Sequence, residues 1–224
     1  MDDLDYMSYE NPLRKIIKII LDKIISLFAL VILSPVLLVL ALLIKLDSSG
    51  QVFFVQERVG KDGVIFKSIK FRTMVDRAVE KGLGLNIKQD DERITRMGKF
   101  LRTWSLDELP QILNVLSGDM SIVGPRPTLP YQVECYNDFQ RRRLLVKPGI
   151  TGWAQVNGRN AISWEQRIKL DIWYVDNWSL WLDAAILAKT IKVVICKEGL
   201  YGEGGVNDDF LSSKKDNPPS MKSV

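Results

Sequence analysis

The sequence predicts a helix-rich α+β protein in which a membrane-inserted helix precedes a compact domain. The mean hydropathy of +0.01 is high for a chain with 26% charged residues, so apolar residues must be concentrated in one segment. Residues 24–44 are that segment, since they contain no charged side chain and are about as long as a membrane helix requires. Residues 51–74 then alternate with a period of two, and apolar residues at helical spacing return after residue 105. We therefore expect a small β-hairpin and a set of helices after the apolar segment.

Composition excludes several classes of function. A chain of 224 residues has the size of one domain with a small appendage. The net charge of +4 is too low for a protein that coats nucleic acid, so no nucleic-acid partner is expected. The sequence contains no histidine, which leaves carboxylates as the main acid–base and nucleophilic groups. Cys135 and Cys196 have no metal-ligand spacing and are interpreted as reduced cytoplasmic thiols.

The chain divides into four parts. Residues 1–15 are polar and are expected to form a flexible N-terminus, and residues 16–46 form the membrane anchor. Residues 47–203 carry the strand and helix patterns of the main domain. Residues 204–224 are rich in Gly, Asp, Lys, Ser and Pro and are expected to form a flexible tail.

A serine–proline pair, Ser34-Pro35, lies in the middle of the apolar segment and is expected to kink it. Proline lacks an amide proton, and a serine hydroxyl can satisfy the backbone group that this leaves free. Basic residues before the segment favour a cytoplasmic N-terminus. These are Arg14, Lys15, Lys18 and Lys23. A helix broken at Ser34-Pro35 could enter and leave through the same leaflet, whereas a kinked helix that crosses the membrane is the alternative.

Residues 52–69 predict a β-hairpin with its turn at residues 60–63. The segment that follows, residues 70–74, alternates cations with apolar side chains. Lys70 and Arg72 could contact phosphate, or they could belong to a solvated strand face. Residues 75–92 are polar and are expected to form a helix followed by a mobile loop, which could act as a lid.

Two clusters of charge frame the centre of the chain. Cations recur three residues apart on a short helix, either as a solvated face or as a site that holds a diphosphate. They are Arg93, Arg96, Lys99 and Arg102. Asp107 and Glu108 then stand at the expected start of a helix, with Pro110 in its first turn and Ser105 as a capping candidate. This position favours an ionised carboxylate, which would suit a nucleophile or a metal ligand, although plain helix capping is the alternative.

The second half of the chain adds further candidate contacts. Arg126 is held between two prolines, which suits either anion binding or a rigid turn. Residues 141–143 are three arginines expected to face anionic head groups. Residues 147–159 predict an extended, glycine-containing loop that ends at Arg159. Residues 163–196 predict one or two helices whose tryptophans suit a membrane interface, with a soluble aromatic core as the alternative.

From about residue 22 to residue 202, the chain resembles the bacterial polyprenyl-phosphate phosphoglycosyl transferases of the monotopic, single-domain type. Seven segments carry the resemblance in the family's order: Ser34-Pro35, Lys70–Met74, Asp90–Arg96, Leu106–Gln111, Gly124–Pro127, Pro148–Arg159 and Asp171–Val175. The chain has Gly50-Gln51 where members often have Gly-Pro, which touches no chemistry.

The resemblance implies a re-entrant membrane helix, interfacial amphipathic helices and an active site at the cytoplasmic face of the bacterial inner membrane. It implies a UDP-sugar donor, a polyprenyl (undecaprenyl) phosphate acceptor and the start of surface-glycan assembly. Asp107 would be the nucleophile that forms a phosphosugar–aspartyl intermediate and releases UMP, and Glu108 would coordinate Mg²⁺.

The active site should contain several cations. A carboxylate and a diphosphate are both negative, and they repel each other unless positive charge surrounds them. The candidates are Lys70, Arg72, Arg102, Arg126 and Arg159, and Asp171 would contact the nucleotide or the metal. Membrane lipids, a second copy of the chain and downstream glycosyltransferases are the further partners expected. The alternative functions are a non-catalytic scaffold of a glycan-assembly complex and a polyprenyl-diphosphate hydrolase, and the intact carboxylate pair disfavours the scaffold.

Overall fold

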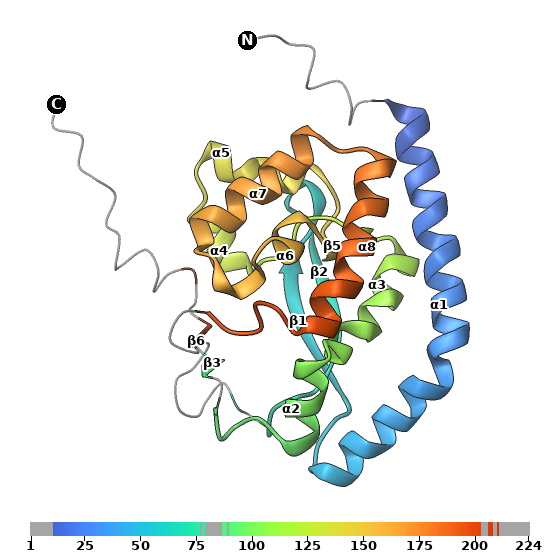
Figure 1. Ribbon diagram of the computed structural model, residues 1–224, viewed down its shortest axis with the longest axis vertical. Helices are drawn as coiled ribbons and strands as arrows, with labels where there is room; N and C mark the ends of the chain where they lie inside the picture. Colours follow the sequence, from blue (N-terminus) through green and yellow to red (C-terminus); the bar gives the residue numbers. More distant parts are fainter. Residues whose placement is uncertain are drawn as a thin grey trace, which may run out of the picture.

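A computed structural model describes residues 11–76, 78, 87–88, 90–202, 206–207 and 210. The long helix α1 (Pro12–Asp47) lies along one side of a mixed body of short strands and helices (Figure 1). The mixture of helices with small sheets agrees with the predicted helix-rich α+β class. The expected lid between residues 75 and 92 lies largely outside the described residues, and so does most of the expected tail.

Helix α1 is long and apolar enough to cross a membrane. Its most apolar stretch of 18 residues has a mean hydropathy of 3.1 and is mostly exposed. The helix begins at Pro12, because the Asn11 side chain accepts hydrogen bonds from the amides of Leu13 and Arg14. Residues 12–15, which we placed in the flexible N-terminus, therefore form the first turn of the helix.

The prediction at Ser34-Pro35 is confirmed in its local chemistry. Pro35 has no amide proton for the carbonyl of Val31, and the Ser34 hydroxyl donates to that carbonyl at 2.8 Å instead. The chain nevertheless stays helical through Pro35, so α1 is one bent helix rather than two separate helices. Figure 1 shows α1 running beside α8 and α3 and then bending towards α2 in its second half.

The predicted hairpin is confirmed as β1 (Phe53–Val59) and β2 (Ile65–Phe71), paired antiparallel around the 3₁₀ turn Lys61–Gly63. Asn114 extends the free edge of β2, because its side-chain amide bonds the backbone of Ile69 and Lys67. Alternation along the strands places Phe54, Gln56, Arg58, Lys70 and Arg72 on one face.

A second, parallel pair joins β4 (Ser121–Val123) to β5 (Gly149–Thr151). The backbones approach closely just beyond this pair: a Cβ added to Gly124 would lie 2.4 Å from the Lys147 carbonyl oxygen. A Cβ on Gly149 would lie 2.1 Å from the amide nitrogen of Gly124. Only glycine fits at these two positions, and together they hold the segment that carries Arg126.

The remaining elements are short apart from α7 and α8. They are β3 (Ile87–Lys88), α2 (Arg96–Thr103), the 3₁₀ helix η4 (Leu106–Gln111), α3 (Ile112–Ser117), α4 (Pro130–Glu134), α5 (Asp138–Arg141), η5 (Arg142–Leu145), α6 (Trp153–Val156), η6 (Arg159–Ala161), α7 (Trp164–Asp176), α8 (Leu180–Cys196) and β6 (Val206–Asn207). β3 and β6 form a third small sheet, also antiparallel. The prediction of one or two helices within residues 163–196 is confirmed, and there are two, α7 and α8.

Aromatic residues of α7 and the following turn divide between core and surface. Tyr174 and Trp178 are fully buried and centre the largest apolar cluster, which also contains Ile186 of α8. Trp173 is partly exposed and stacks on Trp153, whereas Trp181 is 83% exposed. The tryptophan-rich region therefore contributes to the core and to the surface at once.

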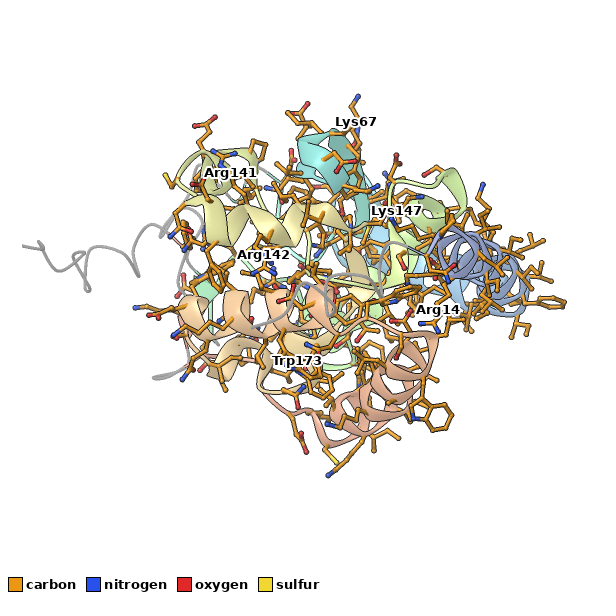
Figure 2. The ribbon with its side chains drawn as sticks, turned by 90° about the horizontal axis from the view of Figure 1, so that it is seen from above. Arg14, Lys67, Arg141, Arg142, Lys147 and Trp173 are labelled. Carbon is orange, nitrogen blue, oxygen red and sulfur yellow. The ribbon has the colours of Figure 1, made fainter. Side chains whose placement is uncertain are left out.

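The three consecutive arginines do not form one surface cluster, which corrects our interpretation. Arg143 is 4% exposed and pairs with Asp171, and Arg142 pairs with Asp176. Figure 2 shows Arg141 at the outer edge of the molecule and Arg142 turned towards its middle. Successive residues of a helical turn point about 100° apart, so a run of like charges need not share one face.

Candidate active site

Asp107 and Glu108 lie on η4, a 3₁₀ helix between α2 and α3. We expected an α-helix to begin at or just before Asp107, but α3 begins at Ile112. Pro110 explains the difference, because it cannot donate the amide hydrogen bond that an α-helix would direct to the Leu106 carbonyl. A 3₁₀ helix would direct the same missing amide bond to the Asp107 carbonyl, so Pro110 interrupts both patterns, and the six residues of η4 present both carboxylates before the α-helix starts.

Ser105 does not cap a helix, which corrects the predicted capping box. Its backbone is left-handed, with φ of 55°, and its hydroxyl accepts a hydrogen bond from Arg159 at 2.9 Å. Arg159 is itself left-handed, with φ of 53°. Two non-glycine residues in this region, bonded to each other beside Asp107, store backbone strain of the kind that gathers at functional sites.

Glu108 is held by two cations from different elements. Lys70 of β2 donates to Oε1 at 2.6 Å, and Arg126 donates to Oε1 at 2.7 Å and to Oε2 at 3.1 Å. Burial alone would raise the pKa of Glu108, but Arg126 and Lys70 together hold it well below its ordinary value. Glu108 is therefore ionised at any physiological pH.

Asp107 has the opposite surroundings. None of the described residues forms a hydrogen bond or an ion pair with its carboxylate. Burial and the neighbouring charge of Glu108 raise the pKa of Asp107, and Lys70, Arg102 and Arg126 only partly offset this. Asp107 is thus a more basic carboxylate with free lone pairs, as a nucleophile requires.

A cavity of about 510 Å³ opens over the two carboxylates. This volume is within the range of small-molecule sites. The described residues that line it include nine arginine or lysine side chains and four carboxylates. The cations come from both strands of the hairpin and the residue after it, from α2 and the residues before it, from the Pro-Arg-Pro segment, from η5 and from the α6–α7 region. Such an excess of positive charge suits a ligand with several negative charges.

The eight predicted catalytic and substrate-binding residues all line this cavity, but their side chains differ in what they bind. Arg96 and Lys99, which could also have held a diphosphate, are not among its lining residues. Arg102 donates through Nε to the Thr73 hydroxyl at 2.8 Å. Arg72 instead binds the carbonyls of Ser48 and Ser49, at the end of α1. The hydrogen bonds of Arg72 therefore join the anchor to the hairpin.

Asp171 lies on α7 and is 1% exposed. Its Oδ2 pairs with Arg143 at 2.6 Å, and its Oδ1 is a buried oxygen without a hydrogen-bond partner in the described structure. Arg143 also donates to the backbone carbonyl of Arg126 at 3.1 Å. The buried Asp171–Arg143 pair therefore supports Arg126 from behind, while Arg126 holds Glu108 in front.

The sequence indicated neither Arg58 nor Arg167 as a cavity residue, and it placed Arg143 on the surface. Arg58 donates to the Pro127 carbonyl at 3.2 Å, and burial beside Arg126 lowers its pKa to about 10. The period of two along β1 could have found Arg58, because it shares a strand face with Phe54. Arg143 carried no such signal, since nothing in a triplet of arginines indicates which member is buried.

The donor atoms fit a magnesium ion that substrate phosphates help to hold. Among the described residues, no group of three or more acidic or thiol side chains could coordinate a metal alone. Mg²⁺ commonly uses one or two carboxylates together with phosphate oxygens. Glu108 uses three of its roughly four acceptor positions, so it retains capacity for one bond to such an ion.

A family model described as bacterial sugar transferase matches residues 13–197. This range includes α1, the hairpin, both carboxylates and every cation discussed above.

Curated relatives are similar over most of the chain. The chain is 48% identical to the uncharacterised sugar transferase EpsL of Bacillus subtilis over 201 residues, which are 90% of this chain and 98% of that protein. It is 43% identical to the undecaprenyl-phosphate galactose phosphotransferase of Salmonella typhimurium, over 80% of this chain and 40% of that protein. An N-acetylgalactosaminephosphotransferase of Aeromonas hydrophila that acts with UDP-N-acetylgalactosamine and undecaprenyl phosphate, by its name, is also 43% identical, over 83% and 45%. The chain thus spans nearly all of one relative and less than half of the other two.

Proposed function

This chain belongs to the bacterial sugar transferases, and from that premise we propose that it moves a sugar-1-phosphate from a UDP-sugar to undecaprenyl phosphate, with Asp107 as the nucleophile. The observation that carries the proposal is the contrast between two adjacent carboxylates in a cationic cavity: Glu108 is neutralised by Lys70 and Arg126, and Asp107 has no partner among the described residues. The names of the Salmonella and Aeromonas relatives support the lipid acceptor.

In the first step, Asp107 attacks the phosphorus that carries the sugar. A new bond forms between its carboxylate oxygen and this phosphorus, and the bond to the bridging oxygen breaks, so that UMP leaves with that oxygen. Lys70, Arg102, Arg126 and Arg159 stabilise the charge that spreads over the phosphate oxygens. No proton transfer is needed, which suits a chain without histidine.

In the second step, a phosphate oxygen of the polyprenyl phosphate attacks the same phosphorus. The bond to Asp107 breaks, the carboxylate is regenerated and a polyprenyl-diphosphate sugar is formed. The nucleophile is already ionised as a phosphate, so again no base is needed. The product would begin the assembly of a surface glycan.

Mg²⁺ would be held by Glu108 together with the donor's phosphates, and it would offset negative charge on the diphosphate. Lys70 and Arg126 keep Glu108 ionised for this purpose. Their bonds also fix the orientation of the Glu108 carboxylate.

We place the protein at the cytoplasmic face of the bacterial plasma membrane, with α1 as a re-entrant anchor. The bend of α1 and its Ser34–Val31 hydrogen bond support a helix that turns back within the bilayer. A re-entrant anchor would let a water-soluble donor and a lipid acceptor meet at one depth.

UMP release from a panel of UDP-sugars tests this proposal. Purified protein with Mg²⁺ and undecaprenyl phosphate should release UMP from one donor, and Asp107→Asn should reduce the rate by at least a thousandfold. Asp119→Asn is the matched control, since Asp119 is an acidic residue outside the cavity, and it should retain the wild-type rate. Release that persists in Asp107→Asn would overturn the assignment of the nucleophile.

A further inference from the structure

The first turns of α1 are joined to the main domain by a polar cluster that the proposed chemistry does not use. Lys18 and Asp22 are one helical turn apart, so both face the same way. The Lys18 ammonium donates to Asp183 Oδ2 at 2.6 Å, and both side chains are about nine-tenths buried. Asp22 accepts from the Ser121 hydroxyl at 2.7 Å and from the Ile122 amide at 3.2 Å.

Asp183 is the centre of this cluster. Its Oδ1 accepts from the Tyr174 hydroxyl at 2.7 Å, and its Oδ2 accepts from the Trp178 indole at 3.1 Å in addition to Lys18. Both aromatic rings are fully buried. A hydrogen-bonded buried charge pair in such surroundings has one well-defined geometry, because any displacement leaves a charge unpaired.

The cluster also holds β4 directly. The Val123 carbonyl accepts from Lys18 at 3.2 Å and from the Tyr174 hydroxyl at 3.2 Å. With Asp22 on Ser121 and Ile122, all three residues of β4 are bonded to α1. Lys18 is therefore buried against protein and is not available to anionic head groups.

Both residues between β4 and Arg126 are held by backbone hydrogen bonds. The Gly124 amide donates to the Thr151 carbonyl at 2.9 Å, and the Pro125 carbonyl accepts from the Gly149 amide at 2.9 Å. The Arg126 carbonyl accepts from Arg143, and its guanidinium binds Glu108. A continuous set of bonded groups thus runs from the membrane helix to the site.

We propose that Lys18, Asp22 and Asp183 form a clasp that couples the membrane helix to β4 and thereby positions Arg126 against Glu108. Since the role of Arg126 in the reaction is part of the proposed function, the kinetic half of this inference rests on it. The residues of the clasp are positioning residues, because they touch neither the cavity nor its ligands. The position of α1 in the bilayer would then be transmitted to the site.

The kinetic test uses the first half-reaction, in which UMP is released without a lipid acceptor. Lys18→Met removes the charge but keeps the length of the side chain. We expect a single-turnover rate of UMP release at least tenfold lower, a half-saturating donor concentration within threefold of wild type, and rescue to within threefold by Lys18→Arg. Lys23→Met, at an exposed residue of the same helix, is the matched control and should not change the rate.

A structural readout makes the test independent of activity. The Ile122 amide donates to Asp22, and the Gly124 amide lies next to Val123, so hydrogen exchange of these amides reports the state of β4. In Lys18→Met the exchange of both amides should accelerate at least tenfold, with circular dichroism showing a folded protein. If Lys18→Met does not fold, Asp22→Asn replaces it, because this variant keeps the acceptor oxygen but loses the charge.

Wild-type exchange in a folded variant would overturn the clasp, and wild-type kinetics with accelerated exchange would overturn the positioning of Arg126. If the wild-type protein itself releases no UMP from any donor, the proposed function fails, while the exchange experiment still decides whether the clasp exists.

Discussion

Asp107 and Glu108 are neighbours in sequence but have opposite effects on stability. The pKa of Glu108 is lowered, so its ionised form stabilises the fold above its ordinary pKa, and this contribution is lost as the pH falls through the lowered value. The pKa of Asp107 is raised, so its ionised form lowers the free energy of unfolding at neutral pH. Environments that separate two carboxylates in this way assign them different roles.

Thermal unfolding of two variants tests this contrast. Glu108→Gln leaves Lys70 and Arg126 without a charged partner and should reduce the free energy of unfolding by about 2 kcal/mol. Asp107→Asn removes a buried charge that no described residue pairs with, so its Tm should equal or exceed that of the wild type. Both variants should lose activity. A large fall in the Tm of Asp107→Asn would contradict the electrostatic account.

The rate of adduct formation should depend on pH through Asp107. A nucleophilic carboxylate must be ionised, so the rate should fall as the pH decreases through the raised pKa. The midpoint should lie above the ordinary aspartate value of about 4. Single-turnover rates of UMP release between pH 4 and 8 measure it, with circular dichroism as the control for folding. A rate that is constant down to pH 4 would refute a raised pKa.

Among the elements, the hairpin and the helices α7 and α8 could be predicted from periodicity alone. The 3₁₀ helix η4 could not, although Pro110 carried the signal, because the position of a helix start depends on which backbone groups find partners elsewhere. Ser105 and Arg159 show this most clearly, since each takes a left-handed backbone and bonds the other from 54 residues away. A contact between residues so far apart in the sequence produces no periodic pattern from which it could be predicted.

Helix α1 was predicted from its apolar composition. The hydrogen bonding around Pro35 allows a test of whether the bend of α1 determines its topology. In Pro35→Ala the Val31 carbonyl regains its amide partner, so the helix should straighten and favour a membrane-crossing arrangement. A cysteine introduced as Asp5→Cys, with Cys135 and Cys196 replaced by serine, should then react with an impermeant reagent added outside cells. The same cysteine should stay unreactive with Pro35 present.

Pro12→Ala is the control for this experiment, since Pro12 is in the first helical turn, where no amide partner is required. Labelling should be unchanged in that variant. Equal labelling of the Pro35 and Pro35→Ala proteins would show that the bend does not determine topology.

At the scale of the whole molecule, the cavity is lined by segments that lie far apart in the sequence. Hairpin, α2, η4, the Pro-Arg-Pro segment and α7 each contribute charge to it, and α1 is bonded to the same body at Lys18 and Asp22. Motifs predicted most of the cations that line the cavity. They did not predict which cation binds which carboxylate, because that depends on how buried charges such as Arg143 and Asp171 pair.

The most direct test of the account is the mass of the protein after reaction with its UDP-sugar in the absence of lipid acceptor. We predict an increase equal to one sugar phosphate, located by peptide mapping on Asp107, absent in Asp107→Asn and removed on addition of undecaprenyl phosphate. UMP release at the full rate without an adduct, or an adduct on another residue, would contradict Asp107 as the nucleophile.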